Sequence, residues 1–350
     1  MTSYTGIGYL IRSCDHSLRK NINKQKMVVT TDYSPVLEGH QVPQAWFDAP
    51  LSNYRGKSES LKSILTEEIA ALQAFYLYQT SPDKAAQAIT RPISNSFIPD
   101  LGTYSDEIVA LCKLWEVLVN ALIEWPPSHT PDLVALLTAI SNIPDYIHRG
   151  EATDDDGRTL AWNGLPYFTM LWRDAHWMSP GDIAQECSND NEAARQHARN
   201  NYLKTQDVEA QLVAAGVFDM RHAFHSLIWI LERKPDPTDG DKDKAEVSNE
   251  AEAETYEPLE PDFDIPAAVY WIKHNGQKLY GSLSKDRMEN WNQKDIPSVA
   301  KHFDQPTQHW SFWENRLIEI TKDGPDDFVR NAAELAVRYM QDIKDSSEKL

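Results

Sequence analysis

The feature that most constrains the fold is a series of long segments in which apolar residues recur every three or four positions. The clearest is residues 60–79, with Leu61, Ile64, Leu65, Ile69, Leu72 and Tyr76. This spacing places apolar side chains along one face of an α-helix. Composition agrees, because Ala and Leu together number 61 whereas Val and Gly together number 30, which favours helices over strands and turns. The sequence therefore predicts an all-α fold.

Helix start and stop signals divide these segments. Ser81-Pro82-Asp83 and Thr130-Pro131-Asp132 each combine an N-cap residue, a proline at the first helical position and a first-turn acid. Gly216 follows the helical segment 192–215 and is suited to the left-handed conformation that ends a helix. We expect the next segment, 218–233, to fold back on it as a helical hairpin. In total we expect about nine to eleven helices in a single globular domain.

Residues 234–264 interrupt the helical pattern. They hold 12 acids and three lysines, a net charge of 3 − 12 = −9, together with four prolines. Such a segment cannot bury enough apolar surface to fold, so we expect a long acidic disordered insertion. We expect helices to resume at 265–275, ending at Gly276, and again at 307–322 and 325–343. The expected organisation is a basic flexible segment (1–41), a first helical part (42–233), the acidic loop (234–264) and a second helical part (265–350).

Charge excludes some classes of partner. The formal net charge of the chain is −19, which opposes binding to nucleic acid and to anionic membrane surfaces. No apolar run reaches the ~18 residues needed to span a bilayer. The three cysteines form neither a disulfide framework nor a metal pair. We therefore predict a cytoplasmic protein that binds neither nucleic acid nor membrane.

The start of the chain offers one alternative compartment. Residues 1–27 hold five basic residues and one acid, a composition found in mitochondrial transit peptides. A flexible tail has the same composition, and Met27 is an alternative initiator. The cytoplasmic prediction stands beside a mitochondrial alternative.

No catalytic motif is assembled along the sequence. His222 and His225, with Asp219 before them, share neighbouring faces of a predicted helix, but a metal site needs a third or fourth ligand. We therefore predict no metal and no cofactor. If the chain is an enzyme, its acid and base candidates are Asp174, His176, His222 and His225, which combine protonatable groups with aromatic or helical surroundings.

The 11 tryptophans are the most informative residue type. Their ordinary role is packing within and between helices, with each indole N–H bonded to an oxygen. The alternative is an aromatic groove for a ligand or a partner peptide. The candidates for that groove are Trp172, Trp177, Trp310 and Trp313.

Several spaced aromatic blocks give the chain a family resemblance. They are Pro43-Gln44-Ala45-Trp46-Phe47-Asp48, residues 167–174 (YFTMLWRD), the hairpin 194–232, residues 264–272 (DIPAAVYWI) and Trp310-Ser311-Phe312-Trp313. Together they resemble a family of filamentous-fungal proteins known as domain of unknown function 3632. The resemblance implies a fungal source, an all-helical fold and one domain that spans the acidic stretch. It supplies no catalytic residues.

Two functions compete on this basis. The first is a non-enzymatic helical scaffold that binds a protein partner through the Trp-rich groove, with the acidic loop attracting basic partners. The second is an enzyme or carrier for a small apolar metabolite, as an accessory protein of fungal specialised metabolism. An enclosed pocket of about 300 Å³ with converging histidine and carboxylate groups is the feature that favours the second.

Overall fold

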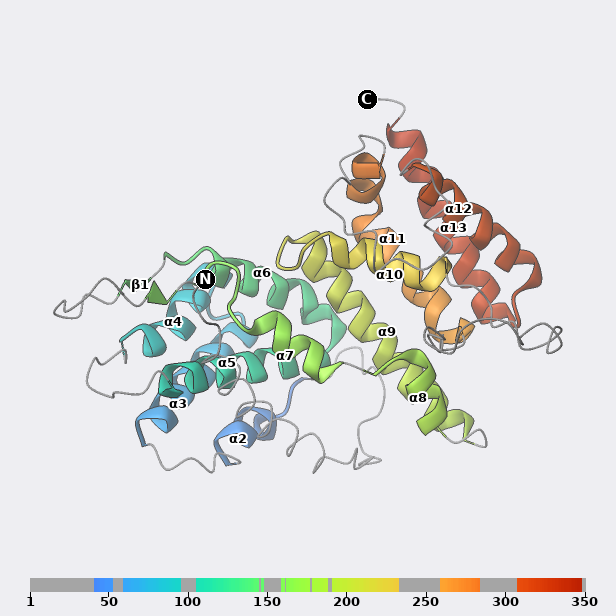
Figure 1. The fold of residues 1–350 in the computed structure, drawn as a ribbon. Helices are drawn as coiled ribbons and strands as arrows, with labels where there is room; N and C mark the ends of the chain where they lie inside the picture. The colour runs from blue at the N-terminus through green and yellow to red at the C-terminus, as the bar shows by residue number, and fades with distance from the viewer. Residues whose placement is uncertain are drawn as a thin grey trace, which may run out of the picture. The chain divides into compact units, whose positions relative to one another are not determined.

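The computed structural model shows a helical protein whose described residues form two compact units. These residues are 41–52, 59–95, 105–144, 146–147, 159–160, 162–176, 178–187, 191–232, 259–283 and 307–347. Unit 1 covers residues 1–175 and unit 2 covers residues 176–350. Helices dominate both units (Figure 1), which confirms the all-α fold class.

Unit 1 is built from helices that lie within residues 44–175. They are α2 (Gln44–Ser52), α3 (Glu59–Tyr76), α4 (Pro82–Asn95), α5 (Ser105–Glu124), the 3₁₀ turn η2 (Pro127–His129), α6 (Thr130–Ser141) and α7 (Phe168–Ala175). A two-residue antiparallel ribbon, β1 (Tyr146–Ile147) with β2 (Thr159–Leu160), was not expected from the sequence. The predicted helix start at Pro82 is confirmed. Helix α6 begins one residue earlier than predicted, because Thr130 is its first helical residue and His129, without a side-chain cap, holds the N-cap position.

Trp115 on α5 anchors the core of unit 1. Its side chain is buried, and its Nε1–H donates to the carbonyl oxygen of Pro166 at 2.7 Å. The ring meets Trp162 and Phe168 edge-on, with centroid distances of 6.1 and 5.6 Å. These contacts fix the turn before α7 against α5, so that turn is held by aromatic packing and one hydrogen bond.

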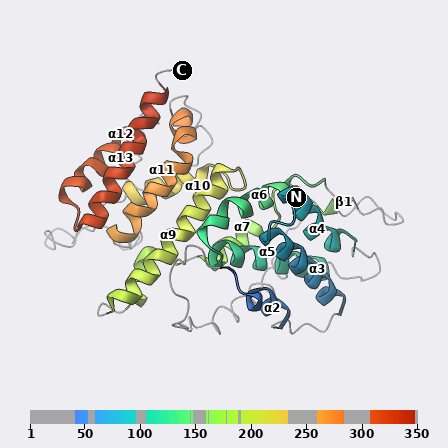
Figure 2. The ribbon, with the colours of Figure 1, turned by 180° about the vertical axis from the view of Figure 1, so that it is seen from behind.

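Unit 2 contains the remaining helices. They are α8 (Pro180–Glu186), α9 (Glu192–Ala214), α10 (Arg221–Leu231), α11 (Pro261–Leu283), α12 (Thr307–Asp323) and α13 (Asp327–Ser347). Helix α11 is buried along most of its length and packs on α9, α10, α12 and α13. Helices α12 and α13 run side by side, as Figure 2 also shows. Helices from both sides of the acidic segment therefore share one core.

The limits of α11 differ from the expectation. We expected this helix to start at Ile265 and to end at Gly276, but it runs from Pro261 to Leu283. A Cβ at Gly276 would lie 2.6 Å from Ile343 Cδ1. This glycine therefore permits close approach of α13 and does not end the helix. At the other end, Pro261 takes the first helical position, where a missing N–H costs nothing.

The turn between α9 and α10 has the backbone conformation that we expected. Gly216 has φ +81°, and the amides of Gly216 and Val217 bond to the carbonyl oxygens of Val213 and Leu212. This pair of bonds closes the helix end in the way that a left-handed glycine allows. Helix α9 nevertheless packs mainly on α11, and less on α10.

Several predictions fall on residues outside the described part of the chain. The basic segment 1–40, most of the acidic loop (233–258) and residues 284–306 belong to this group. The domain limits given above stay predictions. Within the described helices, none combines the length and the apolar character that crossing a membrane requires.

Candidate functional site

The described members of the predicted tryptophan groove are buried. Trp172 lies on α7 in unit 1, and Trp310 and Trp313 lie on α12 in unit 2; at most 2% of each is exposed. Their charged sequence neighbours lie on other faces of the same helices, which is why the sequence suggested that these tryptophans line a groove. Trp177 lies outside the described residues. The three described indoles contribute to packing, so a partner surface has to be sought elsewhere.

Trp313 belongs to a buried polar centre in unit 2. Glu232 Oε1 accepts hydrogen bonds from His309 Nδ1 and from Trp313 Nε1, both at 2.6 Å. Phe224 lies against both rings, with centroid distances of 5.2 and 5.9 Å. This centre fastens α12 to the C-terminal end of α10.

The predicted acid and base candidates belong to both units, with His222 and His225 together on α10. His222 Nδ1 lies 3.4 Å from Glu209 Oε1, and its ring stacks on Phe218. His225, three residues further along α10, is exposed. Asp174 belongs to unit 1 and His176 to unit 2; both are half-buried. Among the described residues, no three His, Cys, Asp or Glu side chains are placed to hold a metal ion.

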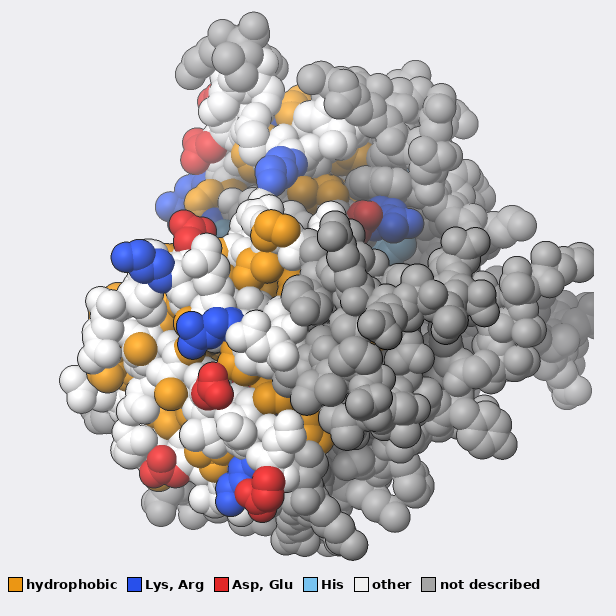
Figure 3. All heavy atoms as spheres, turned by 90° about the vertical axis from the view of Figure 1, so that its left-hand side faces the viewer, with side chains coloured by type: hydrophobic (Ala, Val, Ile, Leu, Met, Phe, Trp, Pro, Cys, Tyr) orange, Lys and Arg blue, Asp and Glu red, His pale blue; other side chains and the backbone are white. Residues whose placement is uncertain are grey.

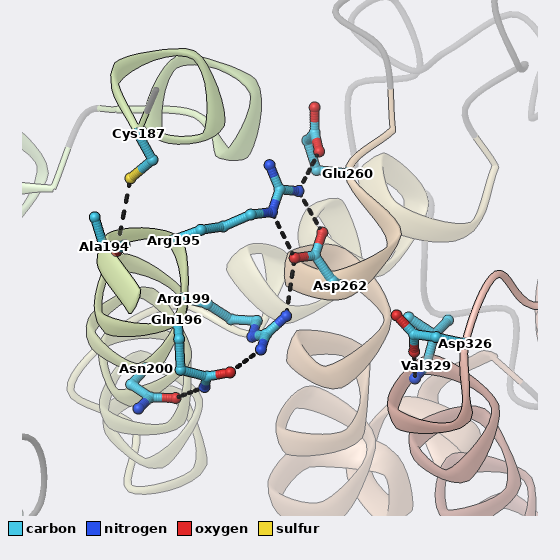
Figure 4. Close-up of polar contacts among 10 residues, drawn as sticks. All are labelled: Cys187, Ala194, Arg195, Gln196, Arg199, Asn200, Glu260, Asp262, Asp326 and Val329. Carbon is cyan, nitrogen blue, oxygen red and sulfur yellow. Dashed lines mark hydrogen bonds and ion pairs between the residues drawn. The ribbon is translucent and has the colours of Figure 1, made fainter. Parts of the chain in front are cut away.

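An ion-pair cluster that the sequence analysis missed joins α9 to the start of α11. Arg195 bonds to Asp262 through Nε at 3.0 Å and Nη2 at 2.7 Å, and Nη2 also reaches Glu260 at 2.8 Å. Arg199 Nη1 bonds to Asp262 at 3.0 Å. Figure 4 shows both arginines reaching from α9 toward this carboxylate. We call these four residues the arginine–acid cluster.

The electrostatics of the arginine–acid cluster are those of a structural ion-pair network, in which Arg199 Nε alone is buried without a hydrogen bond. Burial alone would raise the pKa of Asp262, but the hydrogen bonds and charges of Arg195 and Arg199 outweigh it and lower that pKa. The bond to Asp262 in turn raises the pKa of Arg195. Each guanidinium also lies over a phenylalanine ring, Arg195 over Phe263 and Arg199 over Phe328. The cluster holds α11 to α9 through two acids at the end of the segment 234–264, which are therefore part of the folded unit.

A second aromatic group, in unit 1, reaches the surface. Trp125 is buried at its centre, with ring centroids 5.3 Å from Trp46, 4.9 Å from Tyr76 and 6.0 Å from His129. Tyr78 completes the group by stacking on His129 at 5.8 Å with an interplanar angle of 27°. We call the set the aromatic platform; its members are Trp46, Phe47, Tyr76, Tyr78, Trp125 and His129.

Tyr78 presents the outer edge of the aromatic platform. Its side chain is 70% exposed, and that of the adjacent Leu77 is 49% exposed. Its backbone has φ 55° and closes the end of α3, because the amides of Tyr78 and Gln79 bond to the carbonyl oxygens of Phe75 and Ala74. This is the position at which glycine is usual, since a side chain strains the left-handed conformation. A large aromatic residue is thus held outward on a strained but rigid turn.

Two acids flank the aromatic platform. Trp46 Nε1 donates to Glu124 Oε2, and the half-exposed Asp132 carboxylate lies 4.0 Å from His129 Nδ1. Burial lowers the pKa of His129, while the charge of Asp132 acts in the opposite direction. The imidazole is therefore mainly neutral at pH 7, which leaves the flanking charge negative.

Sequence reasoning missed Tyr78 because it extended the helix to Gln79. A signal was present, since Leu77 and Tyr78 stand directly before the helix start at Ser81-Pro82-Asp83 without a glycine between them. Where a helix ends in the left-handed conformation and no glycine is present, another residue has to adopt it. The exposed pair could therefore have been suspected.

Comparison with known proteins gives one result. A family model described as "Protein of unknown function (DUF3632)" matches residues 115–317, which is more than half of the 350 residues. This match confirms the resemblance inferred from the aromatic blocks, while the fungal source stays a prediction. No curated protein and no solved structure matches the chain.

Proposed function

Because the chain belongs to the DUF3632 family of proteins of unknown function, we propose a function from its structure: a non-enzymatic helical scaffold that binds a protein partner through the aromatic platform of unit 1. The exposed Tyr78 carries this proposal. A bulky residue in the left-handed conformation costs about 1–2 kcal/mol, and such strain concentrates at functional sites. An aromatic side chain held rigidly outward loses little entropy on binding.

The platform has the composition of an interface centre. Tyrosine and tryptophan are enriched among the residues that dominate binding energy, and Tyr78 is supported from behind by His129, Tyr76 and Trp125. Figure 3 shows one face of the molecule, on which hydrophobic side chains surface in small groups between separate charged ones. The partner surface we propose is small, because Tyr78 and the adjacent Leu77 are its exposed large hydrophobic residues.

The flanking charge defines the partner's chemistry. Asp132 and Glu124 border the platform, and the whole chain carries a net charge of −19. We therefore expect a partner segment with an apolar or aromatic side chain next to lysine or arginine, whose charges speed association with an acidic surface. Trp172, Trp310 and Trp313 support the scaffold from within its cores.

A crosslinking experiment tests this proposal. A photoreactive benzoylphenylalanine replaces Tyr78 in cells that make the protein naturally, and crosslinked products are identified by mass spectrometry. We expect one reproducible partner. Affinity purification of the chain without the crosslinker should then recover about tenfold less of that partner with Tyr78→Ser than with wild type, the loss typical of an interface anchor. The matched control is Trp229→Ser, which removes an aromatic residue of unit 2 that is 44% exposed.

Two outcomes contradict the proposal. The first is the absence of any reproducible crosslinked protein at position 78. The second is equal recovery of the partner with Tyr78→Ser and with wild type.

A further inference from the structure

The chain enters the described part of unit 1 beside the aromatic platform. The N–H of Val42 donates to the hydroxyl oxygen of Tyr76 at 2.6 Å, and Trp46, four residues later, is itself a member of the platform. Tyr76 and Tyr78 both lie against the His129 ring, with centroid distances of 4.9 and 5.8 Å. The residues that precede Val42 are therefore tethered next to the surface that Tyr78 presents.

The sequence of that tethered segment has the chemistry that we expect of a partner. Residues 1–27 hold five basic residues and one acid, a net charge of +4, whereas the rest of the chain carries −23, because the total is −19. Within them, Tyr9-Leu10-Ile11-Arg12 places one aromatic and two aliphatic side chains directly before an arginine. Such a group complements an exposed tyrosine that Glu124 and Asp132 border.

The length of the intervening chain permits the contact. Residues 13–41 separate Arg12 from Val42, and a flexible chain of about 30 residues has a root-mean-square span of about 30 Å. A segment tethered over that span meets its own platform at an effective concentration on the order of millimolar. The segment does not have to bind tightly in order to occupy the surface.

The small size of the platform favours a tethered occupant. Its exposed large hydrophobic residues are Leu77 and Tyr78, whereas stable protein interfaces bury about 1,200–2,000 Å² in total. A surface of this kind binds weakly, and weak binding fills a surface only when the occupant is locally concentrated. A segment of the same chain meets that condition at any protein concentration.

We propose that the segment around Tyr9-Leu10-Ile11-Arg12 docks on the aromatic platform of its own chain. Its apolar side chains contact Tyr78 and Leu77, and the Arg12 guanidinium pairs with the half-exposed carboxylate of Asp132. This inference rests on the proposed function, because the segment occupies the surface that is offered to the partner. A protein partner with the same chemistry has to displace it, so the segment limits partner binding.

Photocrosslinking of the purified full chain tests the docking in the absence of any partner. Benzoylphenylalanine replaces Tyr78, and the chain is irradiated at low micromolar concentration. Tryptic peptides from the monomeric product are then identified by mass spectrometry. We expect a crosslink between position 78 and the peptide of residues 1–12, which trypsin releases after Arg12.

Two double variants form a matched pair for this experiment. Leu10→Ser with Ile11→Ser removes the aliphatic group and should lower the yield of the crosslink about tenfold. Val28→Ser with Val29→Ser removes two aliphatic side chains that are nearer to Val42 in sequence, and should leave the yield unchanged. Crosslinks confined to other peptides, crosslinks that join two copies of the chain, or equal yields from the two double variants overturn the proposal.

The result can be told apart from that of the crosslinking in cells. A partner recovered in cells, without a crosslink to residues 1–12 in the purified chain, overturns the docking and leaves the proposed function standing. A crosslink to residues 1–12, without any partner in cells, supports the docking and overturns the proposed function.

Discussion

Units 1 and 2 differ in two local features: the partners of a buried carboxyl group and the residue that ends a helix in the left-handed conformation. The buried carboxylate of unit 2, Asp262, has two arginine partners, whereas the buried Glu68 of unit 1 has no hydrogen bond. The end of α9 in unit 2 uses Gly216 in the left-handed conformation, whereas the end of α3 in unit 1 places Tyr78 there. At these two positions unit 2 follows the local rule and unit 1 departs from it, although unit 2 also has buried polar atoms without a hydrogen bond, such as Glu232 Oε2.

This difference indicates which unit to search for a functional site. Proteins depart from local structural rules mainly at functional or strained sites. Among the residues that the structure describes, the three non-glycine residues with positive φ, namely Tyr78, Leu165 and Tyr167, all belong to unit 1. Unit 1 therefore holds the described backbone positions that are strained in this way, and the aromatic platform includes one of them, Tyr78.

The largest expected effect on the free energy of unfolding comes from removing the negative charge of Asp262. Asp262→Asn should lower the free energy of unfolding by about 3 kcal/mol at pH 7, because two partly buried arginines lose their charged partner. Since the folded-state pKa of Asp262 is lowered, this stabilisation is present above the unfolded pKa of about 4 and is lost as pH falls through the folded pKa. Denaturant unfolding at pH 7 and at pH 3 measures both values.

The matched control for that prediction is Asp327→Asn. Asp327 pairs with Arg330, but 89% of its side chain is exposed, so the expected loss is at most about 0.5 kcal/mol. Similar losses for the two variants would mean that the arginine–acid cluster does not hold α11 to α9.

A smaller effect on the free energy of unfolding is expected at the end of α9, where Gly216 adopts the left-handed conformation. Gly216→Ala should lower the free energy of unfolding by about 1 kcal/mol, because a Cβ strains the left-handed conformation. No atom lies within 4 Å of that Cβ, so the loss isolates backbone strain from steric overlap. An unchanged free energy of unfolding would show that this helix end tolerates a side chain, and the contrast with Tyr78 would disappear.

The smallest effect on stability is expected at the end of α3, where Tyr78 adopts the left-handed conformation. Tyr78→Gly should change the free energy of unfolding by less than about 0.5 kcal/mol. Relief of backbone strain offsets the loss of the ring contact and of the exposed hydroxyl hydrogen bond to His129 Nδ1. Partner recovery should nevertheless fall as it does for Tyr78→Ser. A loss of several kcal/mol on thermal or denaturant unfolding would instead make Tyr78 a structural residue.

Much of the fold could be predicted because helix periodicity and start signals are local. The start of α4 at Pro82, the start of α6 to within one residue, and the end of α9 before Gly216 follow from neighbouring residues alone. Gly276 was misinterpreted because its role depends on Ile343, which is 67 residues away. A glycine that admits a neighbouring helix and a glycine that ends its own helix look the same in sequence.

The candidate sites were harder to predict because burial is not local. Trp310 and Trp313 have polar sequence neighbours, yet both are buried in unit 2. Glu68 was overlooked although it lies on the apolar stripe of α3, because one acid among apolar residues is usually paired or exposed once the chain folds. Only the packing of α5 against α3 shows that it is neither.

The most direct test of this account is the pH dependence of the stability difference between Glu68→Gln and wild type. A folded-state pKa that burial raises makes the wild type lose stability as pH rises from the unfolded value of about 4.3 up to the folded value. We predict nearly equal free energies of unfolding at pH 4. Above that pH the variant should gain by up to about 1.4 kcal/mol per pH unit within this window. A stability difference that stays constant between about pH 4 and about pH 8 would contradict the claim that Glu68 is a buried acid without a partner.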